Sequence, residues 1–374
     1  MADRIPDAIV IGAGLVGAAC ADALAAAGLS VLVLEAGVAG GGATAAGMGH
    51  VVVLDDSEPQ LALTAYSRDL WDALLPDLPA DCEARRCGTL WVAADAEEME
   101  GVRRKEAICR AHGVAAEILD PAALAAAEPA LRPGLAGGLR VPGDCVVYPP
   151  AVTRFLLDRA RGRGARVWTG AAVASIEDGG VRLADGSAVA AGRVVNAAGL
   201  SAGRLTPGLP IKARKGHLVI TDRCPGFARH QLIELGYLKS AHGGAADSVA
   251  FNLQPRTTGQ MLLGSSRQYG DETEAVDHAI LARMVRRGCE YMPGLARLQA
   301  LRVWTGFRAA TPDALPFLGP LPGIDRVWLA AGHEGLGITT SLGTGALLAD
   351  LMTGRTPRIP AAPYRPDGRM EMRR

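Results

Sequence analysis

AIVIGAGLVG at residues 8–17 and VLVLE at residues 31–35 are the two segments that decide the fold. The first runs from apolar residues into the pattern Gly-x-Gly-x-x-Gly, and a segment of small residues joins it to the second. This order predicts a strand, a glycine turn, a helix and another strand, the unit that binds a dinucleotide. A secretory signal is disfavoured, because Asp3 and Asp7 flank the single cation Arg4 before the apolar run.

Each part of this pattern has a separate physical task. Gly12 permits the tight turn, Gly14 lets the backbone approach a pyrophosphate, and Gly17 lets the helix pack closely on its strand. The helix N-terminus offers N–H groups to phosphates. Glu35 ends the second strand, where its carboxylate can accept hydrogen bonds from a ribose and would repel a 2′-phosphate. The expected cofactor-binding residues here are Gly12, Ala13, Gly14, Leu15, Val16, Gly17, Glu35 and Ala36.

The composition excludes several classes of partner. The 374 residues carry 39 basic and 39 acidic side chains, so no net charge favours a nucleic acid or a membrane surface. No uncharged run is long enough for a transmembrane helix. The seven cysteines are scattered without a CxxC pair, which indicates reduced thiols in a cytoplasmic protein, and we expect no metal site.

Two further stretches of small residues follow strand-like runs. Residues 37–50 are expected to form a long loop that a ligand orders, with a flexible surface loop as the alternative. Residues 326–331 predict a buried strand, followed by a glycine-rich turn at 332–338 and a helix over 339–352. Thr339 or Thr340 is expected to cap that helix.

The remaining pattern predicts a chain of mixed helices and strands. Helices are expected at 58–75, 97–112, 121 onward, 151–163 and 274–291, and strands at 88–94, 165–168, 173–195 as a hairpin unit, 211–221, 231–235, 248–253 and 260–265. Nucleotide-type elements recur near 8–50, 165–200 and 325–352. One domain is therefore expected to be discontinuous, with the other built from its insertions.

These motifs together resemble a known family. Gly12–Gly17 with Glu35, residues 44–48, residues 194–199, residues 306–313 and residues 331–338 look like FAD-dependent amine oxidoreductases of the D-amino-acid oxidase superfamily. Within it, the chain is similar to glycine oxidases and to the flavin subunits of hydrogen cyanide synthase and D-hydroxyproline dehydrogenase. The resemblance implies an α/β (α+β) fold, with a glutathione-reductase-like FAD-binding domain (1–86, 142–212 and 302–374) and an inserted mixed-sheet substrate domain (87–141 and 213–301).

The resemblance also implies further contacts to noncovalent FAD. The backbone and side chains expected to line the phosphates, adenine or flavin are Thr44, Ala45, Ala46, Gly47, Met48, Val173, Ala198, Gly199, Gly332, Gly335, Leu336, Gly337, Ile338 and Thr339. The turn before Thr339 would direct N–H groups and a helix dipole at flavin O2, where the reduced ring gathers negative charge.

Arg308 stands at the family's carboxylate anchor, and its planar fork suits bidentate carboxylate binding. The alternative for Arg308 is an ordinary salt-bridged arginine. His333 is expected either to polarise a substrate or flavin group or to be a hydrogen-bonded structural histidine. The other candidates for the substrate pocket are His50, Phe251, Tyr237, Tyr148 and Arg267.

Three positions depart from the family's relatives. Phe251 is expected where several glycine-oxidising relatives have a carboxylate-binding tyrosine, which would make the pocket more apolar. Gly306 stands where monomeric sarcosine oxidases tether FAD through a cysteine. Leu262 stands where those oxidases have an oxygen-activating lysine, so direct reaction with oxygen is less secure than substrate oxidation.

The expected activity is FAD-dependent oxidation of the C–N bond of glycine or an N-substituted glycine to an imine, which water hydrolyses to glyoxylate and an amine. The alternatives are a D-amino acid oxidase or dehydrogenase, and a flavin subunit of a D-hydroxyproline dehydrogenase or cyanide-forming complex. Homo-oligomers or electron-transfer partner subunits are compatible with either. A noncatalytic nucleotide scaffold is disfavoured, because it would need neither the turn at residues 332–338 nor Arg308. An NAD-dependent dehydrogenase is disfavoured, because the two glycine-rich turns lie far apart in the sequence, as one extended FAD would require.

Overall fold

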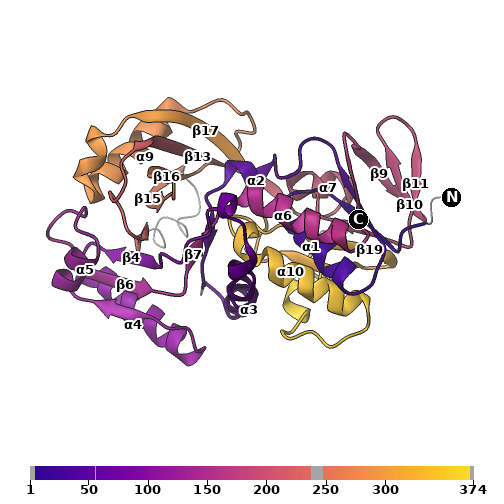
Figure 1. Ribbon diagram of the computed structural model, residues 1–374, viewed down its shortest axis with the longest axis horizontal. Helices are drawn as coiled ribbons and strands as arrows, with labels where there is room; N and C mark the ends of the chain where they lie inside the picture. Colours follow the sequence, from indigo (N-terminus) through magenta and orange to yellow (C-terminus); the bar gives the residue numbers. More distant parts are fainter. Residues whose placement is uncertain (1–4, 55, 237–246, 371–374) are drawn as a thin grey trace.

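The computed structural model describes residues 5–54, 56–236 and 247–370. Two large sheets lie side by side in it (Figure 1). The predicted mixed α/β fold is confirmed.

The first sheet has six strands in the order β18-β19-β12-β1-β2-β8. Their bounds are β1 Ala8–Ile11, β2 Val31–Glu35, β8 Arg166–Thr169, β12 Arg193–Asn196, β18 Phe317–Leu321 and β19 Ile324–Ala331. All neighbours pair in parallel except β18 with β19. This is the sheet that the opening glycine motif predicts.

Both faces of this sheet are covered. Val10 and Val33 face helices α1 (Leu15–Ala26), α6 (Pro149–Gly162) and α10 (Gly337–Met352) in one apolar core, with α3 (Glu58–Leu74) against α10. Ile9 and Leu32 face a three-stranded sheet of β9 (Val173–Glu177), β10 (Gly180–Leu183) and β11 (Ala188–Ala190). Burial on both faces explains why β1 and β2 are continuously apolar.

The second sheet has eight strands in the order β17-β13-β16-β15-β14-β4-β6-β5. Their bounds are β4 Thr89–Ala93, β5 Glu117–Leu119, β6 Gly137–Val141, β13 Lys212–Arg223, β14 Gln231–Glu234, β15 Ser248–Pro255, β16 Gln260–Arg267 and β17 Ala300–Ala310. Helices α4 (Ala96–Ala111), α5 (Pro121–Ala127) and α9 (His278–Tyr291) pack against it.

The remaining elements are short. They are α2 (Ala43–Ala46), β3 (His50–Val51), β7 (Cys145–Val146), α7 (Ala202–Leu205) and 3-10 turns at Leu75–Asp77, Ala80–Cys82, Gly199–Ser201, Pro293–Arg297 and Ala362–Tyr364. Figure 1 shows α2 between the sheets, close to the ends of β13 and β17. The small-residue loop over 37–50 therefore contains one helical turn and runs along the junction.

Several sequence predictions are corrected by the structure. β17 was not predicted, and the proposed domain boundary at residue 302 falls inside it, because β17 pairs with β13 along its length. Helix α9 begins at His278 instead of residue 274, since the Asp277 side chain accepts from the amides of Ala279 and Ile280. Helix α10 begins at Gly337 after the N-cap residue Leu336, so the prediction that Thr339 or Thr340 caps it is wrong.

Two general features of the chain also follow. No helix within the described ranges is long and apolar enough to cross a membrane. All seven cysteines are in described segments, and none of them forms a disulfide bond there.

Candidate flavin and substrate site

The turn before α1 requires all three of its glycines. Gly12 has φ +97°, and a Cβ there would lie 2.7 Å from the Ala197 carbonyl oxygen. A Cβ at Gly17 would collide with the Gly12 carbonyl oxygen, so helix and turn touch through backbone alone. The N-cap residue Gly14 has no side chain to cap α1. The N-terminus of α1 is thus built for close backbone approach by a ligand.

Two side chains fix this turn. Glu35, at the end of β2, accepts hydrogen bonds from the amides of Ala13 (2.7 Å) and Gly37 (2.8 Å). The Thr44 hydroxyl accepts from the Leu15 amide at 3.0 Å, and lies 3.3 Å from where a Gly14 Cβ would be. Glu35 and Thr44 therefore lie at the mouth of the turn, where the sequence predicted a ribose contact and a phosphate contact.

Other predicted residues surround the same turn. Ala198 is beside Gly12, whose added Cβ would lie 3.3 Å from the Ala198 Cα. Gly199 has φ +56° and open space around it. Val173 begins β9 and is buried against the six-stranded sheet. The α1 turn and the small residues after β12 thus form one cradle.

The second glycine turn brings another helix N-terminus to this cradle. An added Cβ at Gly337, the first residue of α10, would lie 3.7 Å from the Val16 side chain of α1. Glu334 adopts φ +50°, and its amide donates to the Ala309 carbonyl of β17 at 3.0 Å. Its carboxylate pairs with Arg214 of β13. The turn over residues 332–337, which directly follows β19 of the six-stranded sheet, is therefore attached to the eight-stranded sheet as well.

The segment around α2 lies against this second turn. A Cβ at Gly47 would lie 3.4 Å from the Ile338 side chain. The Trp304 indole donates to the Ala46 carbonyl at 3.1 Å. A Cβ at Gly306 would lie 2.5 Å from the Ala46 Cβ, so close packing occupies the position where the resemblance placed the cysteine of monomeric sarcosine oxidases. Ala45, Ala46, Gly47 and Met48 thus lie between the turn and the eight-stranded sheet.

Two histidines flank the cradle, His333 buried and His50 partly buried. The Thr340 hydroxyl donates to the Leu336 carbonyl at 2.8 Å and therefore accepts from Nδ1–H of His333 at 3.0 Å. This leaves Nε2 of His333 unprotonated, and neither it nor Nε2 of His50 has a hydrogen-bond partner within the part of the chain that the structure describes. Burial lowers the pKa of His333 to about 4 and that of His50 to about 3. Both imidazoles are therefore neutral at pH 7, and His333 keeps an acceptor, Nε2, for a ligand.

The Thr339 side chain hydrogen-bonds to the segment at β3. Its hydroxyl donates to the His50 carbonyl at 3.1 Å and accepts from the Val52 amide at 3.2 Å. Its side chain is therefore used to hold β3 against α10, and only its backbone is available at the helix N-terminus.

Arg308 lies where the second turn meets the eight-stranded sheet. Its Nη1 donates to the Ser266 carbonyl at 3.0 Å, and its guanidinium lies over Gly216, where an added Cβ would be 2.5 Å from Nη1. On the other side, a Cβ at Gly335 would lie 3.6 Å from its Cδ and Nε. Arg308 is thus held between β13 and the turn that starts α10. Arg267 follows Ser266 directly at the end of β16.

Three other candidates are not brought to this group. Phe251 is fully buried in the core beneath α9, stacked on Tyr291 with ring centroids 4.9 Å apart, so it does not line the site as expected. Tyr148 is 39% exposed, with Arg256 over its ring beyond the far end of β15. Tyr237 lies outside the described residues.

Strand alternation shows which residues the sequence reasoning missed. Since Phe251 and Leu253 face the core, their neighbours Asn252 and Gln254 face the opposite side. Gln254 accepts from the Gly49 amide at 2.8 Å, beside Met48, and the Asn252 Oδ1 is buried with no partner among described atoms. The alternating pattern of β15 could have indicated these residues, but only the pairing of the strands shows which face of β15 lies in the core and which lies in the site.

The residues present fit a bound FAD. Two helix N-termini without side-chain caps converge, glycines at Gly12, Gly14 and Gly17 leave the backbone of the first turn open, and the buried Nε2 of His333 is an acceptor without a partner among the described residues. No three His, Cys, Asp or Glu side chains among the described residues are grouped to hold a metal ion.

Known proteins with similar sequences and structures agree with this fit. Residues 7–351 match the DAO family, described as FAD dependent oxidoreductase. A glycine oxidase from Pseudomonas aeruginosa is 28% identical, over 99% of this chain and 100% of that protein. A D-amino acid dehydrogenase from Xanthobacter autotrophicus is 31% identical, over 81% of this chain and 72% of that protein. The crystal structure of glycine oxidase from Geobacillus kaustophilus has a TM-score of 0.87 and 26% identity, with 99% of both chains covered. The chain belongs to the DAO family of FAD-dependent oxidoreductases, and its cofactor is FAD.

Proposed function

We propose that the chain oxidises the C–N bond of glycine or an N-substituted glycine to an imine, which water hydrolyses to glyoxylate and an amine. The observation that carries this proposal is Arg308, which is held between β13 and the turn that begins α10. When bound, FAD supplies the acceptor for the hydride equivalent that leaves the substrate Cα. The similarity to glycine oxidases supports the same substrate class.

The role of Arg308 is to hold the substrate carboxylate. A guanidinium offers a planar pair of N–H donors that match a carboxylate, and holding one end of a small substrate fixes the orientation of its Cα. Gly216 lets the guanidinium lie directly against β13, and Gly335 places no side chain between Arg308 and the turn that begins α10. A short acid bound to Arg308 would therefore present its Cα toward the α10 N-terminus.

The backbone over Gly335–Ile338 and the neutral His333 have supporting roles. Amides at the start of α10, together with the helix dipole, stabilise negative charge that develops next to them. Nε2 of His333 has an acceptor available for an N–H or O–H group of the ligand. We infer that FAD is held noncovalently, since Gly306 packs directly on Ala46.

Replacement of Arg308 by Leu tests this role. The Leu variant should lose about 2–5 kcal/mol of transition-state binding for N-methylglycine, because a charged hydrogen-bonded pair is removed. Dimethylamine, the same molecule without the carboxylate, should react with the variant and the wild type at similar kcat/KM. Equal losses for both substrates would refute the assignment of Arg308.

A second candidate is a dehydrogenase of D-amino acids that passes electrons to a partner subunit. It is favoured by the 31% identity to a D-amino acid dehydrogenase and by Leu262, where related oxidases have a lysine. The two proposals differ in the electron acceptor. Fast peroxide formation by the isolated chain during turnover favours the oxidase, and fast turnover only with an artificial acceptor dye favours the dehydrogenase.

A further inference from the structure

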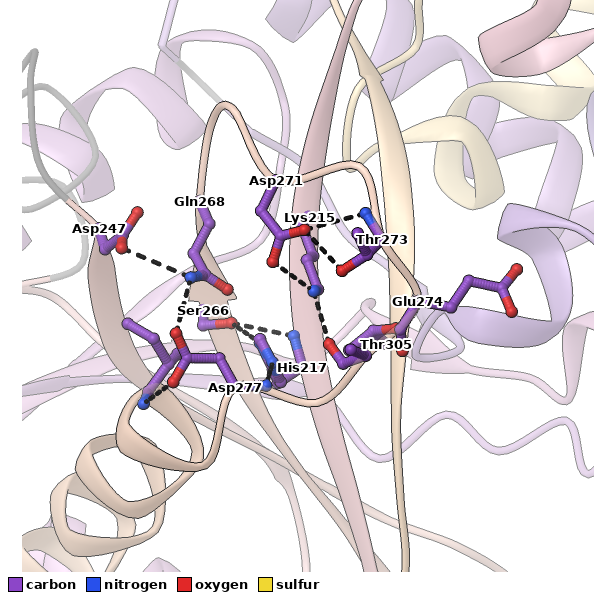
Figure 2. Close-up of polar contacts among 12 residues, drawn as sticks. Lys215, His217, Asp247, Ser266, Gln268, Asp271, Thr273, Glu274, Asp277 and Thr305 are labelled. Carbon is purple, nitrogen blue, oxygen red and sulfur yellow. Dashed lines mark hydrogen bonds and ion pairs between the residues drawn. The ribbon is translucent and has the colours of Figure 1, made fainter.

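A polar cluster lies on the face of the eight-stranded sheet opposite Arg308. Lys215 and His217 alternate with Gly216 along β13, so their side chains point away from the guanidinium that lies over Gly216. Figure 2 shows them beneath the segment 268–277, which connects β16 to α9. The proposed oxidation of an amino acid makes no direct use of these buried side chains.

Lys215 holds this connecting segment in place. Its ammonium group is fully buried and donates to Asp271 at 2.7 Å and to the Ala275 carbonyl at 2.5 Å. The hydrogen bond from Lys215 holds the pKa of Asp271 well below its usual range. On the neighbouring strand, the Thr305 hydroxyl donates to the Glu274 carbonyl at 2.9 Å. The segment is thus fastened to β13 and β17 from below (Figure 2).

The hydrogen bonds of His217 define where its proton lies. Nε2 accepts from the Asp277 amide at 3.0 Å, so the ring proton is on Nδ1, which donates to the Ser266 hydroxyl at 2.8 Å. The His217 amide donates to the same hydroxyl at 2.9 Å. Burial, with a contribution from Lys215, lowers the pKa of His217, which keeps the ring neutral and this arrangement intact at pH 7.

Ser266 connects the two faces of the sheet. Its hydroxyl accepts both donors of His217 on one face, and its carbonyl accepts from Nη1 of Arg308 at 3.0 Å on the other. The position of the Ser266 peptide therefore depends on His217. His217 depends in turn on Asp277, which caps α9.

We propose that His217 is a positioning residue for Arg308, acting through Ser266 to hold the guanidinium in its carboxylate-binding orientation. This inference rests on the proposed function, since it takes Arg308 as the carboxylate anchor. An orienting group matters here because displacement of a binding group by about 1 Å can cost on the order of 100-fold in rate. The hydrogen bonds of Asp277, His217 and Ser266 thus connect the start of α9 to Arg308 in the substrate site.

The test measures ligand binding to the FAD-loaded enzyme by the change in flavin absorbance. Glycolate is the carboxylate probe, because it has the size of glycine and no amine to be oxidised, and glycolamide is the neutral probe. His217→Ala should raise the Kd of glycolate about tenfold or more and leave the Kd of glycolamide unchanged. Ser266→Ala, which removes the acceptor, should give the same pattern.

Conservative and matched variants separate positioning from general stability. His217→Asn places an N–H donor near the position of Nδ1 and should restore glycolate binding to within about twofold of wild type. His230→Ala is the matched control, because His230 is also a largely buried imidazole, bonded through Nδ1 to Glu128 at 3.1 Å, but it lies on the far side of β15 and β16. It should lower the thermal midpoint without changing the Kd of glycolate.

The outcomes separate the positioning role of His217 from the carboxylate-binding role of Arg308. If Arg308→Leu weakens glycolate binding and His217→Ala does not, His217 has no positioning role. If Arg308→Leu leaves glycolate binding unchanged, or glycolate does not perturb wild-type flavin, the carboxylate site itself is wrong. Should His217→Ala not accumulate with FAD, His217→Gln takes its place, since its longer amide loses the geometry at Ser266, and unchanged glycolate binding would again overturn the proposal.

Discussion

Gly12, Gly17 and Gly216 each lie so close to neighbouring atoms that an added Cβ would collide with them. The close backbone packing at Gly12 and Gly17 could be predicted from the sequence because both belong to one local motif, whereas the ribose contact of Glu35 stays a prediction. Arg308 could be proposed only from family resemblance, since its partners Gly216 and Ser266 are distant in the chain. Phe251 was proposed for the substrate pocket, but it faces the core, and its neighbour Asn252 faces the site. The sequence did not show this, because the face on which a residue lies depends on how the strands pair.

Gly216→Ala tests the fit of Arg308 at this scale. The added Cβ would lie 2.5 Å from Nη1, so the flexible guanidinium must move while the backbone stays in place. The KM for an amino-acid substrate should rise about tenfold, with little change in thermal midpoint. Gly162→Ala, where nothing lies within 4 Å, is the matched control. An unchanged KM in Gly216→Ala would mean that Arg308 has another position during catalysis.

The low pKa of His333 predicts how the free energy of unfolding changes with pH. Its folded pKa of about 4 is below the unfolded value of 6.5, so between these two values the unfolded chain binds a proton that the folded one does not. The free energy of unfolding should therefore fall as the pH drops from 6.5 to 4, by about 1.4 kcal/mol per pH unit from this residue. Urea unfolding of FAD-free protein at pH 7 and pH 5 measures it. His333→Gln should show a shallower decline, and an equally steep one would contradict the assignment.

Secondary-structure elements were predicted well where their pattern was amphipathic or apolar throughout. Helices α3, α4 and α6 and the strands β1, β2, β13 and β16 match their predicted positions closely. β17 was missed although it alternates, with Leu301, Val303, Thr305 and Phe307 on one face and Arg302, Trp304, Gly306 and Arg308 on the other. Its site face is not apolar, because it contacts α2 and the turn before α10, so a search for apolar runs passes over it.

Gly17→Ala tests the dinucleotide element. The new Cβ collides with the backbone oxygen of Gly12, which cannot move away without opening the turn before α1. The purified variant should contain little flavin, with an FAD affinity lower by about 100-fold or more. The ratio of flavin to protein absorbance measures this, with Gly162→Ala again as the control. Normal flavin content in Gly17→Ala would show that FAD binds elsewhere.

The whole molecule is built around two large sheets that lie side by side (Figure 1), and the candidate site lies where they meet. The discontinuous arrangement was predictable because nucleotide-type segments recur along the chain. The sequence could not show how the sheets are fastened, since the contacts join residues more than 200 positions apart, such as Gly49 with Gln254 and Ala46 with Trp304.

Gln254→Leu tests the junction between the sheets. Its side chain is buried, and its loss leaves the Gly49 amide without an acceptor. The free energy of unfolding should fall by about 1–3 kcal/mol. Gln299→Leu, at an exposed position, should change it by less than about 0.5 kcal/mol. Equal effects of the two substitutions would argue against a structural role for the Gln254 contact.

Anaerobic bleaching of the bound flavin tests the central claim most directly. Wild-type holoenzyme is mixed without oxygen with glycine, N-alkylglycines and D-amino acids, each paired with the amine that lacks its carboxylate. The account predicts rapid loss of the oxidised-flavin absorbance with glycine or an N-alkylglycine, formation of glyoxylate, and much slower bleaching by the matched amine. Bleaching that is equally fast with and without the carboxylate, or that none of the glycines produces, would contradict it.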